Sequence, residues 1–556
     1  MLLTVFSNYL ILLCIFGYSF VLKKFLFKRE LKLKIYNIDF FYGFLFLIFL
    51  SLLLNFILPL KYFTIPVILF GTILFLFGFN KKSYEINFLY YFIIIFFITF
   101  IAFYGGNNVD SPMYHLQIIK WLSLHKINFG IVNLGIRLGF NSSWHSFIAL
   151  TNIIYDTFNA KYYVSAVIFS ITLYEAIKYK SKINLSYIFL YLFFCYLFLF
   201  SYLHPQNYGV ILSHISNPER DIVSMFLYFF SFYLFIKIFE EREYTNKKVN
   251  LINLLVISTF ICVTTRLTTI LILSLPLYVF YKNYQYKILN NFSNIFIIVF
   301  AFFWMVRSFI LSGCFIFPVE QTCFNTSWSV NIEVLQHMVG EAKRFTRTLP
   351  FLNGVNDYNY SLYTYDWLKP WIKDYLFTTA QLQINMLIIF GLLLLTLLKL
   401  FFIKSVNLTS FKIDQHETII IIVLFFSIIL WMVTPEVRFA WGLHFVIPCF
   451  FITLFIKKNL NKMIERFSQK LFLINFFIIF LLFLSKNIFV FKADDLFSIP
   501  HRKHDFSKIQ KVGTFNDFDI FFNNWKCADY EGICVNNPKK HYNIETKYTY
   551  TFFKKD

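Results

Sequence analysis

Charged residues are scarce in this chain. Asp, Glu, Lys and Arg make up 15% of its 556 residues, whereas a soluble protein carries about 25%. Acidic residues are the scarcer sign, with 30 Asp and Glu against 51 Lys and Arg. Eight cysteines are too few for a disulfide scaffold of this length. This composition excludes a soluble globule, a disordered chain and a coiled coil.

Several catalytic signatures are also missing. No glycine-rich loop ends in Lys followed by Ser or Thr, and no His-Glu-x-x-His motif occurs. The Gly105-Gly106 pair does not form a dinucleotide fingerprint. An enzyme with this sequence would therefore receive its energy with its substrate rather than from ATP.

Apolar residues dominate instead. They make up 58% of the chain, with a mean hydropathy of +0.62, and we expect an all-α polytopic membrane protein. A helix needs roughly 20 apolar residues to cross the bilayer, and about fourteen segments qualify. They lie near 3–22, 38–59, 62–79, 86–104, 161–178, 184–203, 222–239, 250–265, 267–281, 292–311, 383–403, 416–434, 437–456 and 470–491. The first lacks a small-residue cleavage site and is read as a retained helix.

Lysine clusters predict the orientation of these helices. They follow the first, third, fifth, ninth and thirteenth segments and precede the eighth, and such clusters are typical of cytoplasmic loops. The net charge of +21 therefore indicates basic cytoplasmic loops and no nucleic-acid partner. Three segments then fall outside: 105–160, 312–382 and 492–556. The pattern requires a tight pair of short helices that turns at Arg266.

We divide the chain into three units on this basis. Residues 1–85 form N-terminal transmembrane helices, 86–491 form the main membrane domain, and 492–556 form a small outer domain. The last unit is less hydrophobic, and the alternation that starts at Thr546 predicts a strand.

The cysteines agree with this orientation. Four lie within apolar helices, where Cys behaves as a small hydrophobe. The other four form two close pairs, Cys314 with Cys323 and Cys527 with Cys534, both in segments predicted to lie outside. We expect two disulfides in an oxidising compartment; metal binding is the alternative, although no His spacing completes a four-ligand site.

The first outer loop holds the most informative residues. Asp110 closely follows a membrane helix, and Ser111-Pro112 reads as the start of another. We expect that helix to lie on the membrane surface, with His115 in its first turns and Asp110 at its N-terminus, facing a cavity. The alternative is that Asp110 only caps the helix.

Further polar and ionisable residues lie at the predicted outer ends of the helices. Arg137 suits a phosphate ligand, although an arginine there can also snorkel to headgroups. Charges near the bilayer core cost roughly 2.5–3.5 kcal/mol each, so they are usually paired or functional. Structural ion pairs and one outward-opening polar cavity are both open interpretations of this set. Its other members are Asn141, Asp221, Arg266, Arg307, Glu436 and Arg438.

The order of these features resembles the GT-C superfamily of polytopic, polyprenyl-phosphate-sugar-dependent glycosyltransferases. The stretches that carry the resemblance begin at Asn107, Gly135, Ser312 and Pro435: Asn-Asn-Val-Asp-Ser-Pro, Gly-Ile-Arg-Leu-Gly-Phe-Asn-Ser-Ser-Trp, Ser-Gly-Cys-Phe-Ile-Phe-Pro and Pro-Glu-Val-Arg-Phe-Ala-Trp-Gly. Asp110 matches the essential acid of the family's first outer loop. Two features depart from the family: many members have two acids there, and three apolar segments precede the loop here.

The resemblance implies transfer of a sugar from a polyprenyl-phosphate donor to a glycan or lipid acceptor at the periplasmic face of the bacterial inner membrane. Asp110 would act as the base, and Arg137, Arg307 and Arg438 would bind phosphate, with His115, Asn141, Asp221 and Glu436 as further substrate-binding residues. No cofactor is required, although Asp110 with Asp221 offers ligands for a divalent metal. The alternatives are an O-antigen-type polymerase or ligase, and a transporter or flippase of lipid-linked sugars.

Overall fold

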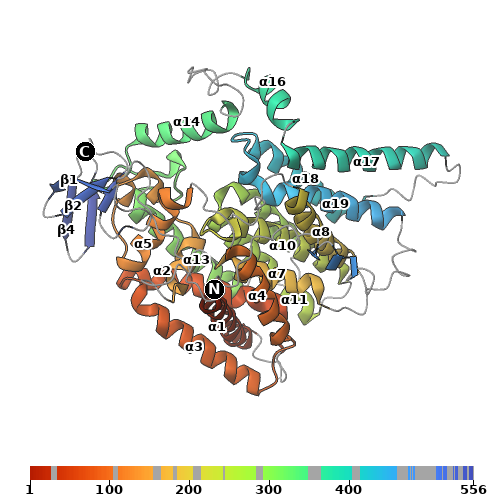
Figure 1. The fold of residues 1–556 in the computed structure, drawn as a ribbon, viewed down its shortest axis with the longest axis horizontal. Helices are drawn as coiled ribbons and strands as arrows, with labels where there is room; N and C mark the ends of the chain where they lie inside the picture. The colour runs from red at the N-terminus through yellow and green to blue at the C-terminus, as the bar shows by residue number, and fades with distance from the viewer. Residues whose placement is uncertain are drawn as a thin grey trace.

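The protein is mostly helical, and its secondary structure is described for most of the chain. The computed structural model describes residues 1–26, 34–103, 110–153, 164–178, 184–203, 214–241, 245–283, 292–348, 365–377, 379–402 and 413–459, and shorter pieces of 474–554. The long helices are α1 (Leu2–Leu26), α2 (Phe40–Ile57), α3 (Lys61–Asn80), α4 (Phe88–Phe103), α7 (Ser165–Ile177), α8 (Leu185–Leu203), α10 (Arg220–Glu240), α11 (Asn246–Thr265), α13 (Phe292–Ser312), α14 (Ile332–Thr348), α17 (Ala380–Phe402), α18 (Gln415–Trp431) and α19 (Trp441–Asn459) (Figure 1). The shorter ones are α5 (Leu116–Leu124), α6 (Ser143–Thr151), α12 (Ser274–Lys282) and α16 (Leu368–Trp371).

Eight of the described helical segments are long and apolar enough to cross a membrane. They contain α1, α2, α3, α8, α10, α11, α13 and α19. Five shorter apolar segments coincide with further predicted spans: Phe88–Ala102, Ser165–Ile177, Leu267–Lys282, Gln381–Leu394 and Gln415–Trp431. The expected total of fourteen stays a prediction, and most of 470–491 lies outside the described residues.

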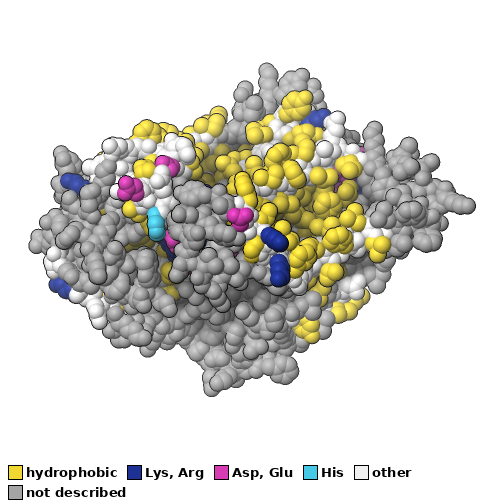
Figure 2. All heavy atoms as spheres, turned by 90° about the horizontal axis from the view of Figure 1, so that it is seen from above, with side chains coloured by type: hydrophobic (Ala, Val, Ile, Leu, Met, Phe, Trp, Pro, Cys, Tyr) yellow, Lys and Arg dark blue, Asp and Glu magenta, His cyan; other side chains and the backbone are white. Residues whose placement is uncertain are grey.

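Hydrophobic side chains gather on the surface as well as in the core. The space-filling view shows a broad apolar area with few charged side chains in it (Figure 2). Exposed large side chains include Leu387 and Phe390 on α17 and Phe425 on α18. Side chains of this kind face lipid in a membrane protein, because the acyl chains are as apolar as they are.

Helix α10 lies at the centre of the bundle. It packs against α7, α8, α11 and α19, and every side chain from Asp221 to Ile236 is buried. Its 21 residues span about 30 Å, the thickness of the hydrocarbon layer. The two ends of α10 therefore lie near the two faces of the membrane.

The chain breaks at Arg266, as the charge pattern predicts. Arg266 has extended backbone angles (φ −149°, ψ 110°) and ends α11. A 3₁₀ segment, Leu267–Leu273, and α12 follow, and both pack back against α11. The apolar stretch is therefore a 20-residue helix, α11, followed by a shorter 3₁₀ and α-helical segment, rather than one long helix.

The predicted surface helix after Asp110 forms but is buried. A π-helical turn, Ser111–His115, leads into α5. All side chains from Leu116 to Ser123 are buried, because α6 covers one side and the C-terminal segment another. Phe553 packs edge-on against Trp121, with ring centroids 5.8 Å apart. The sequence predicts a helix on the membrane surface, and in the structure protein covers both faces of α5.

The tail contains strands, as expected. Strands β1 (Gln510–Phe515), β2 (Phe518–Phe522) and β3 (Ile533–Val535) form one sheet in the order β1-β2-β3, with β1 antiparallel and β3 parallel to β2. Strands β4 (Asn543–Lys547) and β5 (Tyr550–Lys554) form an antiparallel pair. The backbone of Phe129 bonds to Thr551 and Phe553, so β5 is tied to the first outer loop.

One disulfide, Cys314–Cys323, is confirmed. It closes the loop after α13, which packs on Val132 and Leu335. Cys534 is disulfide-bonded as well, while Cys527 lies outside the described residues.

A buried polar network lies at the C-terminal end of α10. Asp39, 0% exposed, accepts hydrogen bonds from Lys23 (2.6 Å) and Asn250 (3.0 Å). Glu175 accepts from Tyr233 of α10 at 2.8 Å and pairs with Lys237 at 3.5 Å. The network fastens the ends of α1, α2, α7, α10 and α11 to one another.

We predict that Asp39→Asn strongly destabilises the protein, because it leaves the Lys23 ammonium buried without its counter-charge. Loss of one partner of a buried pair costs about 3–5 kcal/mol. Thermal unfolding in detergent micelles should show a clear fall in the midpoint temperature.

The exposed Lys34–Glu85 pair offers the matched control, and Glu85→Gln should change the midpoint little. The double variant Lys23→Met, Asp39→Asn should recover part of the loss. Equal midpoints for Asp39→Asn and Glu85→Gln would contradict a structural role for the network.

Candidate functional site

Ionisable residues from distant parts of the chain meet at the N-terminal end of α10. We call this set the arginine–carboxylate cluster: Asp110, Glu219, Arg220, Asp221, Arg266, Glu436 and Arg438. Two ion pairs form its frame. Arg438 donates to Asp110 at 2.7 Å, and Arg266 pairs with Asp221. Arg438 and Asp110, which this contact joins, are 328 positions apart in the sequence.

Local structure explains how these side chains meet. Glu219 occupies the N-cap position of α10 without a side-chain capping bond, and Asp221 lies in the first turn, where the helix dipole favours negative charge. Arg266 occupies the break between α11 and the 3₁₀ segment. Arg438 lies in the 3₁₀ turn Val437–Ala440, just before α19.

A glycine lets α19 approach α10 closely. A Cβ atom at Gly442 would lie 2.7 Å from the Cβ of Tyr228, closer than such atoms come in proteins. Because Gly442 lies one turn after Arg438, this close contact fixes Arg438 beside the start of α10.

The members of the cluster interact beyond the two pairs. Arg266 donates a 3.5 Å hydrogen bond to the backbone carbonyl of Arg438, and interacts electrostatically with Arg220 and Glu219. Arg438 interacts in the same way with Glu436 and Tyr114. Burial raises the pKa of the Glu436 carboxyl, against the opposing influence of Arg438.

The two ion pairs differ in their exposure. The side chains of Asp221 and Arg266 are 9% and 7% exposed, so this ion pair is almost fully buried. Those of Asp110 and Arg438 are 21% and 23% exposed. Asp110 and Arg438 therefore form the partly exposed ion pair of the cluster, and Arg220 and Glu436 are partly exposed as well.

A pocket adjoins this cluster. Six of its lining residues carry hydroxyl groups: Ser224, Tyr228, Thr268, Thr269, Ser427 and Thr434. Trp431 and Trp441 also line it. Phe439 forms the shared wall, since its ring lies in the pocket and under the guanidinium groups of Arg266 and Arg438, at 5.0 and 5.4 Å.

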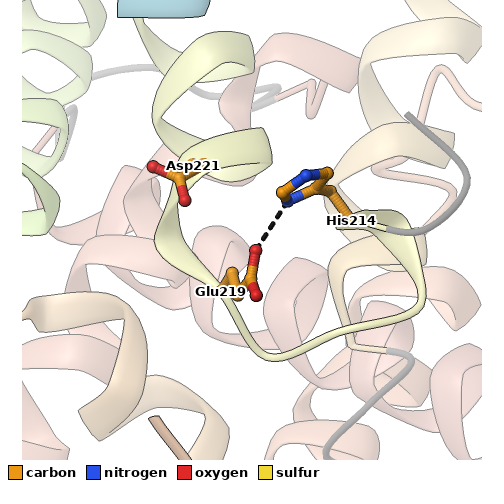
Figure 3. Close-up of side chains that lie close together, drawn as sticks. All are labelled: His214, Glu219 and Asp221. Atoms are coloured by element: carbon orange, nitrogen blue, oxygen red, sulfur yellow. Dashed lines mark hydrogen bonds and ion pairs between the residues drawn. The ribbon is translucent and has the colours of Figure 1, made fainter. Parts of the chain in front are cut away.

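His214, Glu219 and Asp221 present a possible set of metal ligands. Their ligand atoms all lie within 4.8 Å of one another, and the three side chains are buried (Figure 3). His214 Nδ1 already lies 2.6 Å from Glu219, and Asp221 is paired with Arg266. A metal ion would have to break both contacts, so the observed geometry is that of hydrogen-bonded and ion-paired side chains.

The other residues singled out in the sequence lie around the cluster or apart from it. Arg137 packs on the ring of Tyr114 at 5.4 Å, at the edge of the cluster. Arg307 and Asn141 are hydrogen-bonded to each other. Arg307 lines a second pocket, which is formed by α2, α5, the 126–140 loop and α13. The structure therefore brings Asp110, Arg438, Asp221 and Glu436 together but not Arg307.

His115 belongs to a buried histidine pair. Its Nδ1 lies 2.8 Å from Nε2 of His145, and the outer nitrogen of each ring has no partner. Burial lowers the pKa of both, that of His145 to about 3, and the nearby Arg220 adds to the effect. Both rings are therefore neutral near pH 7.

The sequence places Glu219, Arg220 and Arg266 at the outer ends of helices and His145 in the polar run after Arg137, but gives none of them a specific role. The run Glu219-Arg220-Asp221 at the start of an apolar helix was the available signal. Three adjacent charges point to different sides of a helix, so each needs a partner from another element.

The comparisons with known proteins identify a family and no relative of known activity. A family model described as "Domain of unknown function (DUF8201)" matches residues 1–445. No curated protein and no solved structure matches the chain.

The histidine pair predicts that the protein loses stability in mild acid. The unfolded chain protonates both rings below about pH 6.5, whereas the folded chain keeps them neutral. Their contribution is fully present above pH 6.5 and is lost as the pH falls toward 3. The midpoint temperature of thermal unfolding should therefore decrease when the pH is lowered from 7.5 to 5.

His145→Gln should flatten this dependence. Glu436 works in the opposite direction, because its raised pKa favours the folded state as the pH falls, so the comparison with the variant isolates the histidines. An unchanged slope in His145→Gln would rule out the pair as the source.

Proposed function

We propose a function for this chain, which belongs to the family described as Domain of unknown function (DUF8201). From the arginine–carboxylate cluster we infer transfer of a sugar from a polyprenyl-phosphate donor to a glycan or lipid acceptor. The observation that carries the proposal is the Asp110–Arg438 contact. It joins a carboxylate and a guanidinium, the two groups that this transfer needs, at the accessible edge of the cluster.

The adjoining pocket suits a sugar. Hydroxyl groups both donate and accept hydrogen bonds, so a lining rich in them matches a polyol. In this proposal the sugar occupies the pocket, and its phosphate lies beyond the Phe439 ring, beside Arg438.

The proposed reaction uses the residues as follows. The donor phosphate competes with Asp110 for Arg438, since both are anions that a guanidinium fork binds. The released Asp110 carboxylate accepts the proton of the acceptor hydroxyl. The acceptor oxygen bonds to the anomeric carbon as the bond from that carbon to the phosphate oxygen breaks. The lipid phosphate leaves as an anion, and Arg438 stabilises the growing charge.

The disulfide and the lysine pattern support a location for the proposed reaction. The Cys314–Cys323 disulfide favours an oxidising compartment, and it lies in a segment that the lysine pattern assigns to the outside. The acceptor would therefore be met at the periplasmic face of the bacterial inner membrane.

We predict that Asp110→Asn abolishes transfer while the protein still reaches the membrane. Loss of a general base reduces rates by about 10²–10⁴-fold. The measurement is complementation of a deletion strain, with surface-glycan composition as the readout and immunoblotting of membranes as the check on protein level.

Asp519→Asn provides the control, because Asp519 forms an exposed ion pair with Lys511 in the tail. Arg438→Lys should also fail, since it keeps the charge but loses the planar fork. Normal glycans in the Asp110→Asn strain would remove Asp110 from the role of base.

The deletion strain itself distinguishes the proposed function from its alternatives. A transferase predicts loss of one sugar from surface glycans, measured by composition analysis and mass spectrometry. Shortened chains of unchanged composition would indicate a polymerase or ligase. Accumulation of the lipid-linked intermediate at the cytoplasmic side would indicate a flippase.

A further inference from the structure

A second pocket lies between α2, α5, the 126–140 loop and α13. Its polar lining residues include Asn55, Trp121, Lys126, Asn128 and Arg307. The pocket is separate from the hydroxyl-lined one, and the two have no lining residue in common.

Arg307 carries a buried positive charge without a counter-charge. The residue is 4% exposed, and its terminal nitrogen donates to the Asn141 side chain. Its Nε has no hydrogen-bond partner, and no carboxylate pairs with it among the described residues. A guanidinium stays protonated in proteins, and an uncompensated buried charge is strongly unfavourable.

Trp121 presents a second unsatisfied donor in the same pocket. Its indole Nε1 is buried and has no hydrogen-bond partner in the part of the chain that the structure describes. Buried N–H groups are normally paired, so two unpaired donors and a cation in one pocket point to an acceptor that is negatively charged. Lys126 adds a second positive charge to the lining.

The remaining walls are apolar. Ile118, Leu122, Leu138 and Leu311 line the pocket beside the donors. A ligand that satisfies both kinds of wall has an anionic group joined to an apolar part.

The position of Arg307 along α13 indicates which anionic ligands can reach it. It lies five residues before the end of the membrane-spanning helix α13, or about 7.5 Å along its axis. Its Cα therefore lies inside the hydrocarbon layer, close to the edge at which the lipid headgroups begin.

We propose that the Arg307 pocket binds the phosphate group of a lipid, held by Arg307, Lys126 and the indole N–H of Trp121. The pocket is distinct from the arginine–carboxylate cluster, although the two are neighbours. Phe140 lines the pocket, and Arg220 of the cluster packs on its ring at 4.5 Å. The proposal does not depend on sugar transfer, because it concerns binding alone.

The test measures binding to the purified full-length protein in a neutral detergent. The probes are dihexanoyl phosphatidic acid, dihexanoyl phosphatidylcholine and inorganic phosphate, followed by isothermal titration calorimetry. We expect phosphatidic acid to bind more tightly than phosphatidylcholine. Inorganic phosphate binding as tightly as phosphatidic acid would assign the pocket to a free phosphate and overturn the lipid part of the proposal.

Variants locate the binding. Trp121→Phe keeps the ring and removes only the N–H, so it should fold normally and weaken binding of phosphatidic acid about tenfold. Arg307→Gln should weaken it more, with the unfolding midpoint as the check on folding. Lys511→Gln, in the exposed ion pair of the tail, should leave it unchanged.

Two results would overturn the proposal. One is phosphatidic acid affinity that is unchanged in Trp121→Phe and Arg307→Gln. The other is loss of that affinity in Arg438→Gln alone, which would move the phosphate to the cluster. Failure of Asp110→Asn to affect glycans would overturn the transfer proposal and leave this one intact.

Discussion

The N-terminal turn of α10 places three adjacent ionisable residues, Glu219, Arg220 and Asp221, at the end of a helix that is buried along its length. Charges in such a position must be neutralised locally, because water is largely excluded and the membrane offers no compensation. Arg266 forms an ion pair with Asp221, and His214 is hydrogen-bonded to Glu219. The guanidinium of Arg220 packs on the ring of Phe140. The positions of the surrounding elements follow from these contacts.

The opposite end of α10 satisfies its charges in a different way. There Glu175, Tyr233 and Lys237 form a closed network with little exposure. At the N-terminal end, Asp110 and Arg438 remain partly exposed beside a pocket. One end of the central helix is thus built as a fastening, and the other keeps an ion pair within reach of a ligand.

Several features could be read from the sequence because they depend on local composition. Apolar runs give the helices, the isolated Arg266 gives the break after α11, and nine-residue spacing gives the Cys314–Cys323 bond. The burial of α5 could not be read in this way. Its amphipathic pattern is that of a surface helix, but contacts with α6 and the distant Phe553 cover the polar face as well.

The same limit applies to the arginines. Arg137, Arg307 and Arg438 look alike in sequence, since each lies near the predicted outer end of a helix. The structure gives them three different surroundings: an aromatic ring for Arg137, an amide in a separate pocket for Arg307, and the Asp110 carboxylate for Arg438.

The sequence alone determined that this chain is helical, rich in membrane-spanning segments and charged mainly at the ends of its helices, because these properties follow from hydrophobic length and from the cost of placing charge in lipid. The tertiary structure decided which charges meet. Pairing depends on how helices pack, on close approaches such as that of Gly442 to Tyr228, and on contacts between residues hundreds of positions apart, none of which a local pattern encodes.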